Sequence, residues 1–198
     1  VCSKLASAIA AGCASVIKPS ELGPIQAQVV TEALHDAGLP AGAFNVLLGR
    51  GADVGDEIAT HPGIAKLSFT GSTPTGKLIA RAALDTMKRV SLALTGKSAS
   101  IVLDDADVAR ALPLALNAAF MNNGQACVAG TRLLIPRARM REAIERIAAI
   151  ATALRVGDPR DRATAIGPLL NAAQFERVQR FIRPGKEQGA TLVAGGEG

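Results

Sequence analysis

Three cysteines, Cys2, Cys13 and Cys127, are the candidate nucleophiles of the chain, and their surroundings differ. Cys127 follows the polar run Asn-Asn-Gly-Gln-Ala at positions 122–126, directly after a segment with helical spacing, whereas Cys13 lies close to an apolar run. A free cysteine is most often a buried, inert thiol, but polar and glycine-containing surroundings favour a reactive one. The residues alone leave both interpretations of Cys127 open.

The two histidines, His35 and His61, do not supply a second catalytic group by their spacing. They lie far along the chain from each other and from Cys127, and no metal-binding spacing is formed. A cysteine hydrolase would need the fold to bring one of them to Cys127. An odd number of cysteines without framework spacing argues against a disulfide-stapled secreted domain and favours a reducing, cytoplasmic compartment.

A loop at positions 69–77, Phe-Thr-Gly-Ser-Thr-Pro-Thr-Gly-Lys, follows a predicted strand and opens a predicted helix. Such a loop presents backbone N–H groups and the positive end of a helix to an anion. It also matches the Gly-x-x-x-x-Gly-Lys pattern of P-loop nucleotidases, but Leu78 follows where that motif needs a hydroxyl for magnesium. An ordinary strand-to-helix turn is the alternative to a phosphate site.

Lys18 and Glu21 follow the first predicted strand, in the run Lys-Pro-Ser-Glu. At the rim of a parallel sheet, an ammonium and a carboxylate can both hydrogen-bond the vicinal hydroxyls of a ribose. A carboxylate there would repel a ribose 2′-phosphate, so Glu21 favours NAD over NADP. A capping or surface role for the two charges is the plainer alternative.

The elements that position these residues alternate between short apolar runs and segments with helical spacing, which is typical of a mainly parallel α/β sheet. We expect strands at residues 15–17, 44–48, 66–69, 90–94, 100–103 and 132–135. We expect helices at residues 24–37, 53–60, 76–87, 108–119 and 140–154. The first four strands predict a doubly wound, Rossmann-like half whose ligands bind beyond the carboxyl ends of the strands.

The composition is that of a folded globular protein: of 198 residues, 48% are hydrophobic and 20% are charged. No apolar stretch approaches the roughly 20 residues that span a bilayer. The net charge of +5 comes from scattered Lys and Arg, and Tyr and Trp are absent, so no nucleic-acid partner is expected. Both ends, at Val1 and Gly198, look like cuts within a longer chain.

Together, these motifs resemble the aldehyde dehydrogenase superfamily in their order and separations. The resemblance rests on the runs at 18–21, 69–73, 76–77, 92–98, 124–127 and 131–132. Connecting runs such as Phe-Asn-Val at 44–46 and Val-Gly-Asp-Pro at 156–159 also look like that family. The similarity extends from end to end of this chain, but it covers only the middle of a family chain.

The resemblance implies that Cys127 attacks an aldehyde to give a thiohemiacetal, whose oxyanion is held partly by the Cys127 backbone N–H. Hydride then passes to a nicotinamide cofactor, NAD rather than NADP, and the resulting thioester is hydrolysed to a carboxylic acid. No metal is implied. The implied cofactor-binding residues are Lys18 and Glu21 at the adenosine ribose, Gly71 and Ser72 at the pyrophosphate, and Thr70 and Leu94 beside the nicotinamide ring.

The resemblance also implies a division of roles at Gly96. Residues 1–95 would form part of the NAD-binding domain, and residues 96–198 part of a second α/β domain, the catalytic one, which carries Cys127. The whole protein is expected to be a cytoplasmic homodimer or homotetramer that acts on a small aldehyde, with no nucleic-acid or membrane partner. The chain alone is expected to be inactive, because part of the oxyanion hole lies outside it.

Two positions depart from the family pattern. The family run Leu-Glu-Leu-Gly-Gly-Lys is Leu-Ala-Leu-Thr-Gly-Lys at 92–97, so Ala93 replaces the glutamate that activates the hydrolytic water. Losing a general base slows its step by a factor of about a hundred to ten thousand, so we expect impaired deacylation. Thr95 replaces a glycine, and its β-branched side chain is expected either to crowd the nicotinamide or to require a different backbone. The alternatives are a coenzyme A-acylating enzyme and a catalytically dead relative that binds dinucleotide.

Overall fold

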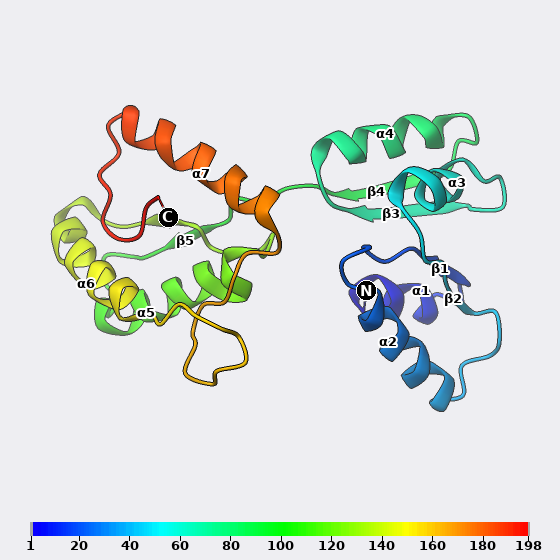
Figure 1. Ribbon diagram of the computed structural model, residues 1–198, viewed down its shortest axis with the longest axis horizontal. Coiled ribbons are helices and arrows are strands. Elements are labelled where there is room, and N and C mark those ends of the chain that lie inside the picture. The colour runs from blue at the N-terminus through cyan, green and yellow to red at the C-terminus, as the bar shows by residue number, and fades with distance from the viewer. Residues whose placement is uncertain (1, 198) are drawn as a thin grey trace. The chain divides into compact units, whose positions relative to one another are not determined.

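The computed structural model describes residues 2–197, which fall into two compact units. Unit 1 comprises Val1–Thr95 and unit 2 comprises Gly96–Gly198. Each unit combines helices with short parallel strands, so the chain has a mixed α/β fold (Figure 1). The suggested cuts at Val1 and Gly198 lie outside the described residues.

Unit 1 contains two pairs of parallel strands. Its elements are α1 (Cys2–Ala10), β1 (Ser15–Ile17), α2 (Pro24–Asp36), β2 (Phe44–Val46), a π-helical turn (Gly51–Gly55), α3 (Asp56–Thr60), β3 (Lys66–Thr70), α4 (Thr73–Leu84) and β4 (Arg89–Ala93). β1 pairs with β2, Ser15 opposite Phe44, and β3 pairs with β4, Lys66 opposite Arg89. Within residues 2–95, no ladder joins one pair to the other.

The sequence predicts one doubly wound sheet for this region, and the structure has the parallel pairing in two separate pairs instead. Alternating apolar residues identify a strand, but they carry no information on which strands share an edge. Each pair also has its own helical cover. Ala59 of α3 and Ala83 of α4 pack with Leu67 of β3 in one buried cluster, whereas Ala27 is the buried residue of α2.

Unit 2 is built around a hydrophobic core between two helices and a strand pair. Its elements are β5 (Ala99–Ile101), α5 (Val108–Phe120), a 3-10 helix (Met121–Gly124), β6 (Arg132–Leu134), a second 3-10 helix (Arg137–Arg139), α6 (Met140–Ala153) and α7 (Ala172–Glu187). β5 pairs in parallel with β6, Ala99 opposite Arg132. Leu112 of α5 and Ala143 of α6 are fully buried, and they form one hydrophobic cluster with the buried residues Val102 and Val108.

Helix α4 begins at Thr73, earlier than the predicted start at residue 76, because the sequence before it supplies a cap. The Ser72 side chain accepts a hydrogen bond from the Thr75 N–H at 3.3 Å. Pro74 stands in the first turn, where its missing N–H costs nothing. Only Gly71 and Ser72 of the predicted phosphate loop therefore lie between β3 and α4, and residues 73–77 already belong to the helix.

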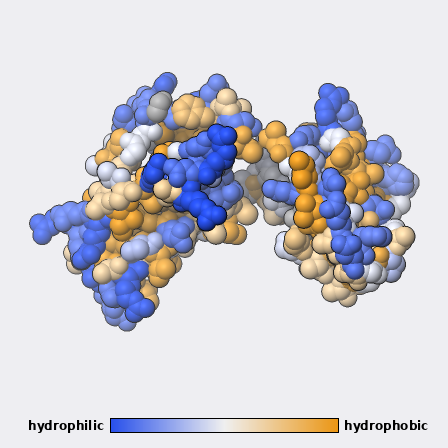
Figure 2. Space-filling model, turned by 60° about the horizontal axis from the view of Figure 1, so that its bottom comes forward, coloured by the Kyte–Doolittle hydropathy of each residue, from blue (hydrophilic) through white to orange (hydrophobic). Residues whose placement is uncertain are grey.

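Helices α1 and α7 were not among the expected helices, although α7 starts at a clear cap. Asn171 accepts the Gln174 N–H through Oδ1 at 2.9 Å. The apolar residues Phe175, Val178 and Phe181 of α7 lie on one face of the helix, and they are 43%, 41% and 68% exposed. Both units carry such hydrophobic side chains on their surfaces, shown in orange in Figure 2. In the part that the structure describes, these side chains are only partly covered.

No helix within residues 2–197 is both long and apolar enough to cross a membrane.

Candidate active site

Cys127 lies between α5 and β6, in residues 121–131, which we call the Cys127 loop. Asn122, Asn123 and Gly124 all have positive φ, at 51°, 58° and 73°. A non-glycine residue in this region costs up to about 1–2 kcal/mol, and asparagine adopts it more readily than most residues. These three residues reverse the chain at the end of α5, and Cys127 follows in a turn with its side chain exposed.

The second half of the Cys127 loop rests on residues 96–97. A side chain on Gly96 would overlap the backbone carbonyl of Cys127, so only glycine fits there. Lys97 donates from Nζ to Thr131 Oγ1 at 2.9 Å, and its carbonyl accepts from Arg132 Nε at 2.7 Å. The backbone immediately beyond Thr95 is thus in direct contact with the loop that carries the cysteine.

The first half of the Cys127 loop is held by residues 167–170, which we call the bracing segment. Asn123 Oδ1 accepts the Gly167 N–H at 2.9 Å, and Asn123 Nδ2 donates to the Pro168 carbonyl at 3.2 Å. Gln125 Oε1 accepts the Leu170 N–H at 2.9 Å. Sequence reasoning assigned no role to these two side chains; the available signal was their place in the polar run before Cys127.

The surroundings of Cys127 support neither a cysteine hydrolase with a histidine base nor a metal site. Both histidines of the chain, His35 and His61, belong to unit 1, so unit 2 itself supplies no histidine base. The Cys127 Sγ has no hydrogen-bond partner among residues 2–197. Within the same residues, no cluster of His, Cys, Asp and Glu is placed to hold a metal ion.

Lys18 and Glu21 lie together beyond β1 and tie this loop to the one beyond β2. Lys18 Nζ donates to Glu21 Oε1 at 3.3 Å, to the Pro19 carbonyl at 2.7 Å and to the Gly49 carbonyl at 3.1 Å. The Gly51 N–H donates to the same carboxylate oxygen at 2.7 Å. Because parallel strands end at the same edge, the two loops meet where a ligand of such a sheet would bind.

The carboxylate of Glu21 has capacity left for a ligand. Hydrogen bonds from its own backbone N–H and from Gly51, followed by the nearby Lys18, lower the pKa of Glu21 below its usual value. Its side chain is 50% exposed, and Oε2 has no partner in the described part of the chain. An ionised oxygen in this position can accept hydroxyl hydrogen bonds. Lys18, in contrast, already directs its three protons at protein acceptors.

Thr70 ends β3, and Gly71 and Ser72 connect it to α4. Thr70 pairs with Ala93, and the Gly71 N–H donates to the Ala93 carbonyl at 3.1 Å. This N–H, predicted to face an anion, is thus engaged in the ladder. Ser72 Oγ lies 2.8 Å from Thr75 Oγ1, which places two hydroxyls at the positive end of α4, and the first turn of α4 contains no acidic residue.

Leu94 lies beside the start of α4. A side chain on Gly76 would overlap the methyl groups of Leu94, so the helix approaches this residue through a glycine. The structure therefore brings Thr70, Gly71, Ser72 and Leu94 together at one end of the β3–β4 pair. The P-loop interpretation fails locally, because Leu78 is an exposed apolar residue inside α4.

Comparison with known proteins identifies the family. The sequence profile of the aldehyde dehydrogenase family matches residues 1–198. The chain belongs to the aldehyde dehydrogenase family. It is 47% identical over 195 residues to the betaine aldehyde dehydrogenase of Rhizobium etli (strain CIAT 652), an alignment that covers 98% of this chain and 40% of that protein.

Solved aldehyde dehydrogenases have the same fold over the matched region. The structure of an aldehyde dehydrogenase C variant from Pseudomonas syringae, in complex with NAD+ and octanal, matches with a TM-score of 0.91 at 49% identity, over 98% of this chain and 40% of that one. An NADP-dependent enzyme of Escherichia coli matches with a TM-score of 0.92 at 38% identity, with the same coverage. The chain spans 40% of the length of these relatives.

Family membership confirms the resemblance on which the predicted roles rest. On that resemblance, Ala93 is the predicted departure that bears most directly on catalysis. Ala93 is the last residue of β4, is exposed, and stands opposite Thr70 in the ladder. Its methyl group can neither take a proton nor orient a water molecule. The roles of the individual residues, including Cys127, remain predictions.

Proposed function

We propose that this chain supplies the nucleophile and much of the cofactor site of an NAD-preferring aldehyde dehydrogenase. The observation that carries the proposal is Cys127: an exposed thiol in a loop that holds two asparagines in the left-handed region and is braced on both sides. Strain that a structure maintains in this way is concentrated at functional sites. Because the chain spans 40% of its relatives' length, the activity is proposed for the whole gene product.

The Cys127 thiolate attacks the aldehyde carbonyl carbon, the C–S bond forms, and the π electron pair moves onto oxygen. The backbone N–H of Cys127, which has no acceptor among residues 2–197, donates to this oxyanion. Bound nicotinamide supplies the acceptor for the hydride that the thiohemiacetal loses. Attack of water on the resulting thioester gives the acid and returns the thiol.

We assign the cofactor to unit 1, as part of an NAD-binding domain, and the chemistry of the thiol to unit 2, as part of the catalytic domain. In the whole protein, the two strand pairs of unit 1 would belong to one doubly wound sheet. The open Oε2 of Glu21 suits a ribose hydroxyl, and the hydroxyls of Ser72 and Thr75 suit a pyrophosphate. Thr70 and Leu94 would flank the nicotinamide. We further propose a cytoplasmic homodimer or homotetramer.

NAD is favoured over NADP because the Glu21 carboxylate stays ionised and would repel a 2′-phosphate. Relatives do not decide this point, since one was crystallised with NAD+ and another is named as NADP-dependent. The local charge is therefore the better guide to cofactor choice.

Ala93 favours a second candidate function. Without a carboxylate at this position, water is a poor acceptor for the acyl group on Cys127, and a thiol such as coenzyme A could replace it. Thiol attack on the thioester forms a new acyl–sulfur bond and releases Cys127, so it needs no water-activating base. A catalytically dead relative, which binds dinucleotide without turnover, is the remaining alternative.

A rapid-mixing experiment tests the proposal. The whole gene product is mixed with NAD and octanal, and NADH absorbance is followed. We expect a burst of about one NADH per Cys127 and then a slow steady rate, because hydride transfer precedes the impaired step. Cys127→Ala should abolish the burst, and Cys13→Ala, the matched control, should retain it.

The remaining outcomes separate the alternatives. Rapid turnover on addition of coenzyme A would establish the acyl-transfer function instead of hydrolysis. NAD binding without any burst would identify a catalytically dead relative. A burst that survives Cys127→Ala would exclude this cysteine as the nucleophile.

A further inference from the structure

The side-chain amide of Asn123 takes the place of a backbone peptide group. Its oxygen accepts the Gly167 N–H and its nitrogen donates to the Pro168 carbonyl, so both ends of the amide are used. Gln125 repeats half of this arrangement two residues further on, with its oxygen on the Leu170 N–H. Side chains from the Cys127 loop thus pair with three backbone polar groups of the bracing segment, those of Gly167, Pro168 and Leu170.

The bracing segment is fixed on its other side. Ile166, just before it, forms a parallel bridge with Val156, and the Gly157 N–H donates to the Ile166 carbonyl at 3.0 Å. The Ile166 N–H donates in turn to the Arg155 carbonyl at 3.1 Å. Residues 155–157 follow α6 after its C-cap Leu154, and Ala143 of α6 belongs to the buried core. The bracing segment therefore connects the Cys127 loop to the best-packed part of unit 2.

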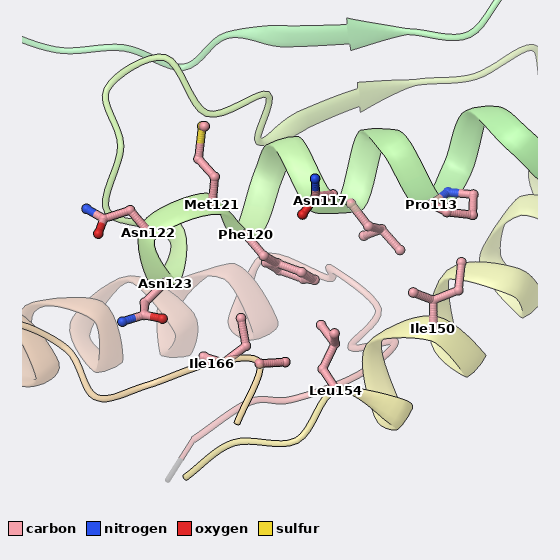
Figure 3. Close-up of a pocket in the computed structure, with 11 residues that line it drawn as sticks. Pro113, Asn117, Phe120, Met121, Asn122, Asn123, Ile150, Leu154 and Ile166 are labelled. Carbon is pink, nitrogen blue, oxygen red and sulfur yellow. The ribbon is translucent and has the colours of Figure 1, made fainter. Parts of the chain in front are cut away.

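A cavity lies beside the end of α5, where the Cys127 loop begins. Phe120 projects into a cavity of about 330 Å³ and faces Leu154 and Ile166 across it (Figure 3). Asn123 comes from the turn at the edge of the same cavity and is directed toward the segment that contains Ile166 (Figure 3). Beside this cavity, the two hydrogen bonds of Asn123 link the turn at the end of α5 directly to Gly167 and Pro168.

We propose that Asn123 and Gln125 are positioning residues that set the place of the Cys127 thiol by binding its loop to the bracing segment. This inference rests on the proposed role of Cys127 as the nucleophile. Gly96 and Lys97 restrain the loop on the far side of Cys127, and Asn123 and Gln125 restrain it on the near side. Displacing a nucleophile by about 1 Å can slow its reaction a hundredfold, so a small movement of the residues before Cys127 is enough to lower the rate.

Two Asn→Asp variants of the whole gene product test the inference. Asn123→Asp keeps the acceptor for the Gly167 N–H but places an oxygen, instead of a donor, against the Pro168 carbonyl. Asn171→Asp is the matched control, because Asn171 uses only its oxygen as the cap of α7 and Asp caps equally well. The burst of NADH is measured for both, together with NAD affinity, the unfolding midpoint and the alkylation of Cys127 by iodoacetamide.

We expect Asn123→Asp to slow the burst about a hundredfold, with little change in the aldehyde concentration that gives half the maximal burst rate. NAD affinity and alkylation on the alkaline plateau should stay near wild-type values, because a freely diffusing reagent does not require the bound geometry. Asn171→Asp should match wild type throughout. A burst rate restored at high pH would overturn the inference, since the effect would then be one of charge on the thiol.

Other outcomes are equally decisive. Equal bursts in Asn123→Asp and wild type would overturn the positioning role alone, whereas absence of a burst in wild type would overturn the proposed function and the positioning role together. If Asn123→Asp does not fold, Gln125→Glu and Gln125→Met replace it. The Glu variant keeps the acceptor for the Leu170 N–H and should retain the burst; the Met variant should slow it about tenfold, and equal rates in the two would overturn the inference.

Discussion

The proposed cofactor residues of unit 1 and the cysteine of unit 2 are positioned by different kinds of structure. Thr70 ends a strand, and Lys18 and Leu94 directly follow strands, so the parallel ladders determine where they lie. Cys127 lies in a loop between a helix and a strand, and its place depends on side-chain hydrogen bonds and on one close backbone approach. Strand ends should therefore accept new side chains, whereas the Cys127 loop should not.

Ala93→Glu is the substitution with the largest expected effect, and it tests the tolerance of a strand end. Ala93 is exposed at the end of β4, and its backbone is held by Thr70 and Gly71, so a longer side chain has room. A general base at this position should raise the slow steady rate after the burst by about a hundredfold to ten-thousandfold. Steady-state NADH formation measures the change.

Ala93→Gln is the matched control, because it has the size of glutamate without its basicity. It should leave the slow rate unchanged. Equal rates in the Glu and Gln variants would show that position 93 does not limit deacylation, and a lost burst in both would show that this strand end is not tolerant.

Gly96→Ala tests the opposite expectation for the Cys127 loop. The added methyl would overlap the Cys127 carbonyl, so the loop must move, and we expect the burst to slow by about a hundredfold. Gly185→Ala is the control in the same unit: it lies in α7, has open space around it, and should stabilise the helix by roughly 0.5–1 kcal/mol. A normal burst in Gly96→Ala would mean that this close approach does not position the thiol.

The difference between the strand ends and the Cys127 loop also explains which features could be predicted from the sequence. The strands at 15–17 and 66–70 and the helix at 24–36 follow from apolar spacing and terminal signals, which are local properties. The pairing of strands into two separate pairs could not be predicted, because it depends on packing between distant segments.

For the site, the sequence indicated Cys127 and the strand-end residues but neither Gly96 nor Asn123 as its supports. Glycine at 96 is required by a carbonyl that lies far along the chain, and Asn123 acts through the distant Gly167. No local pattern carries that information. The capped start of α4 shows the converse: Ser72 and Pro74 are local signals, and they place the helix three residues earlier than apolar spacing alone predicts.

Glu21→Gln has the smallest expected effect and tests whether a strand-end charge selects the cofactor. The amide keeps an acceptor for Lys18 and Gly51 but removes the negative charge, so the preference for NAD over NADP should fall by roughly tenfold.

The pKa of Glu21 is lowered, which keeps the wild-type carboxylate ionised at every pH above its usual value of about 4.3. The 2′-phosphate of NADP is also fully ionised well above pH 6, given a second pKa of about 6. The ratio of kcat/KM for the two cofactors should thus differ between variant and wild type by the same factor at about pH 7.5 and at about pH 9.

This difference between variant and wild type should shrink as added salt screens the exposed carboxylate of Glu21. Glu32→Gln, which removes an exposed charge from α2, should leave the ratio unchanged, and an equal shift in both variants would assign the effect to net charge instead of to the rim of β1.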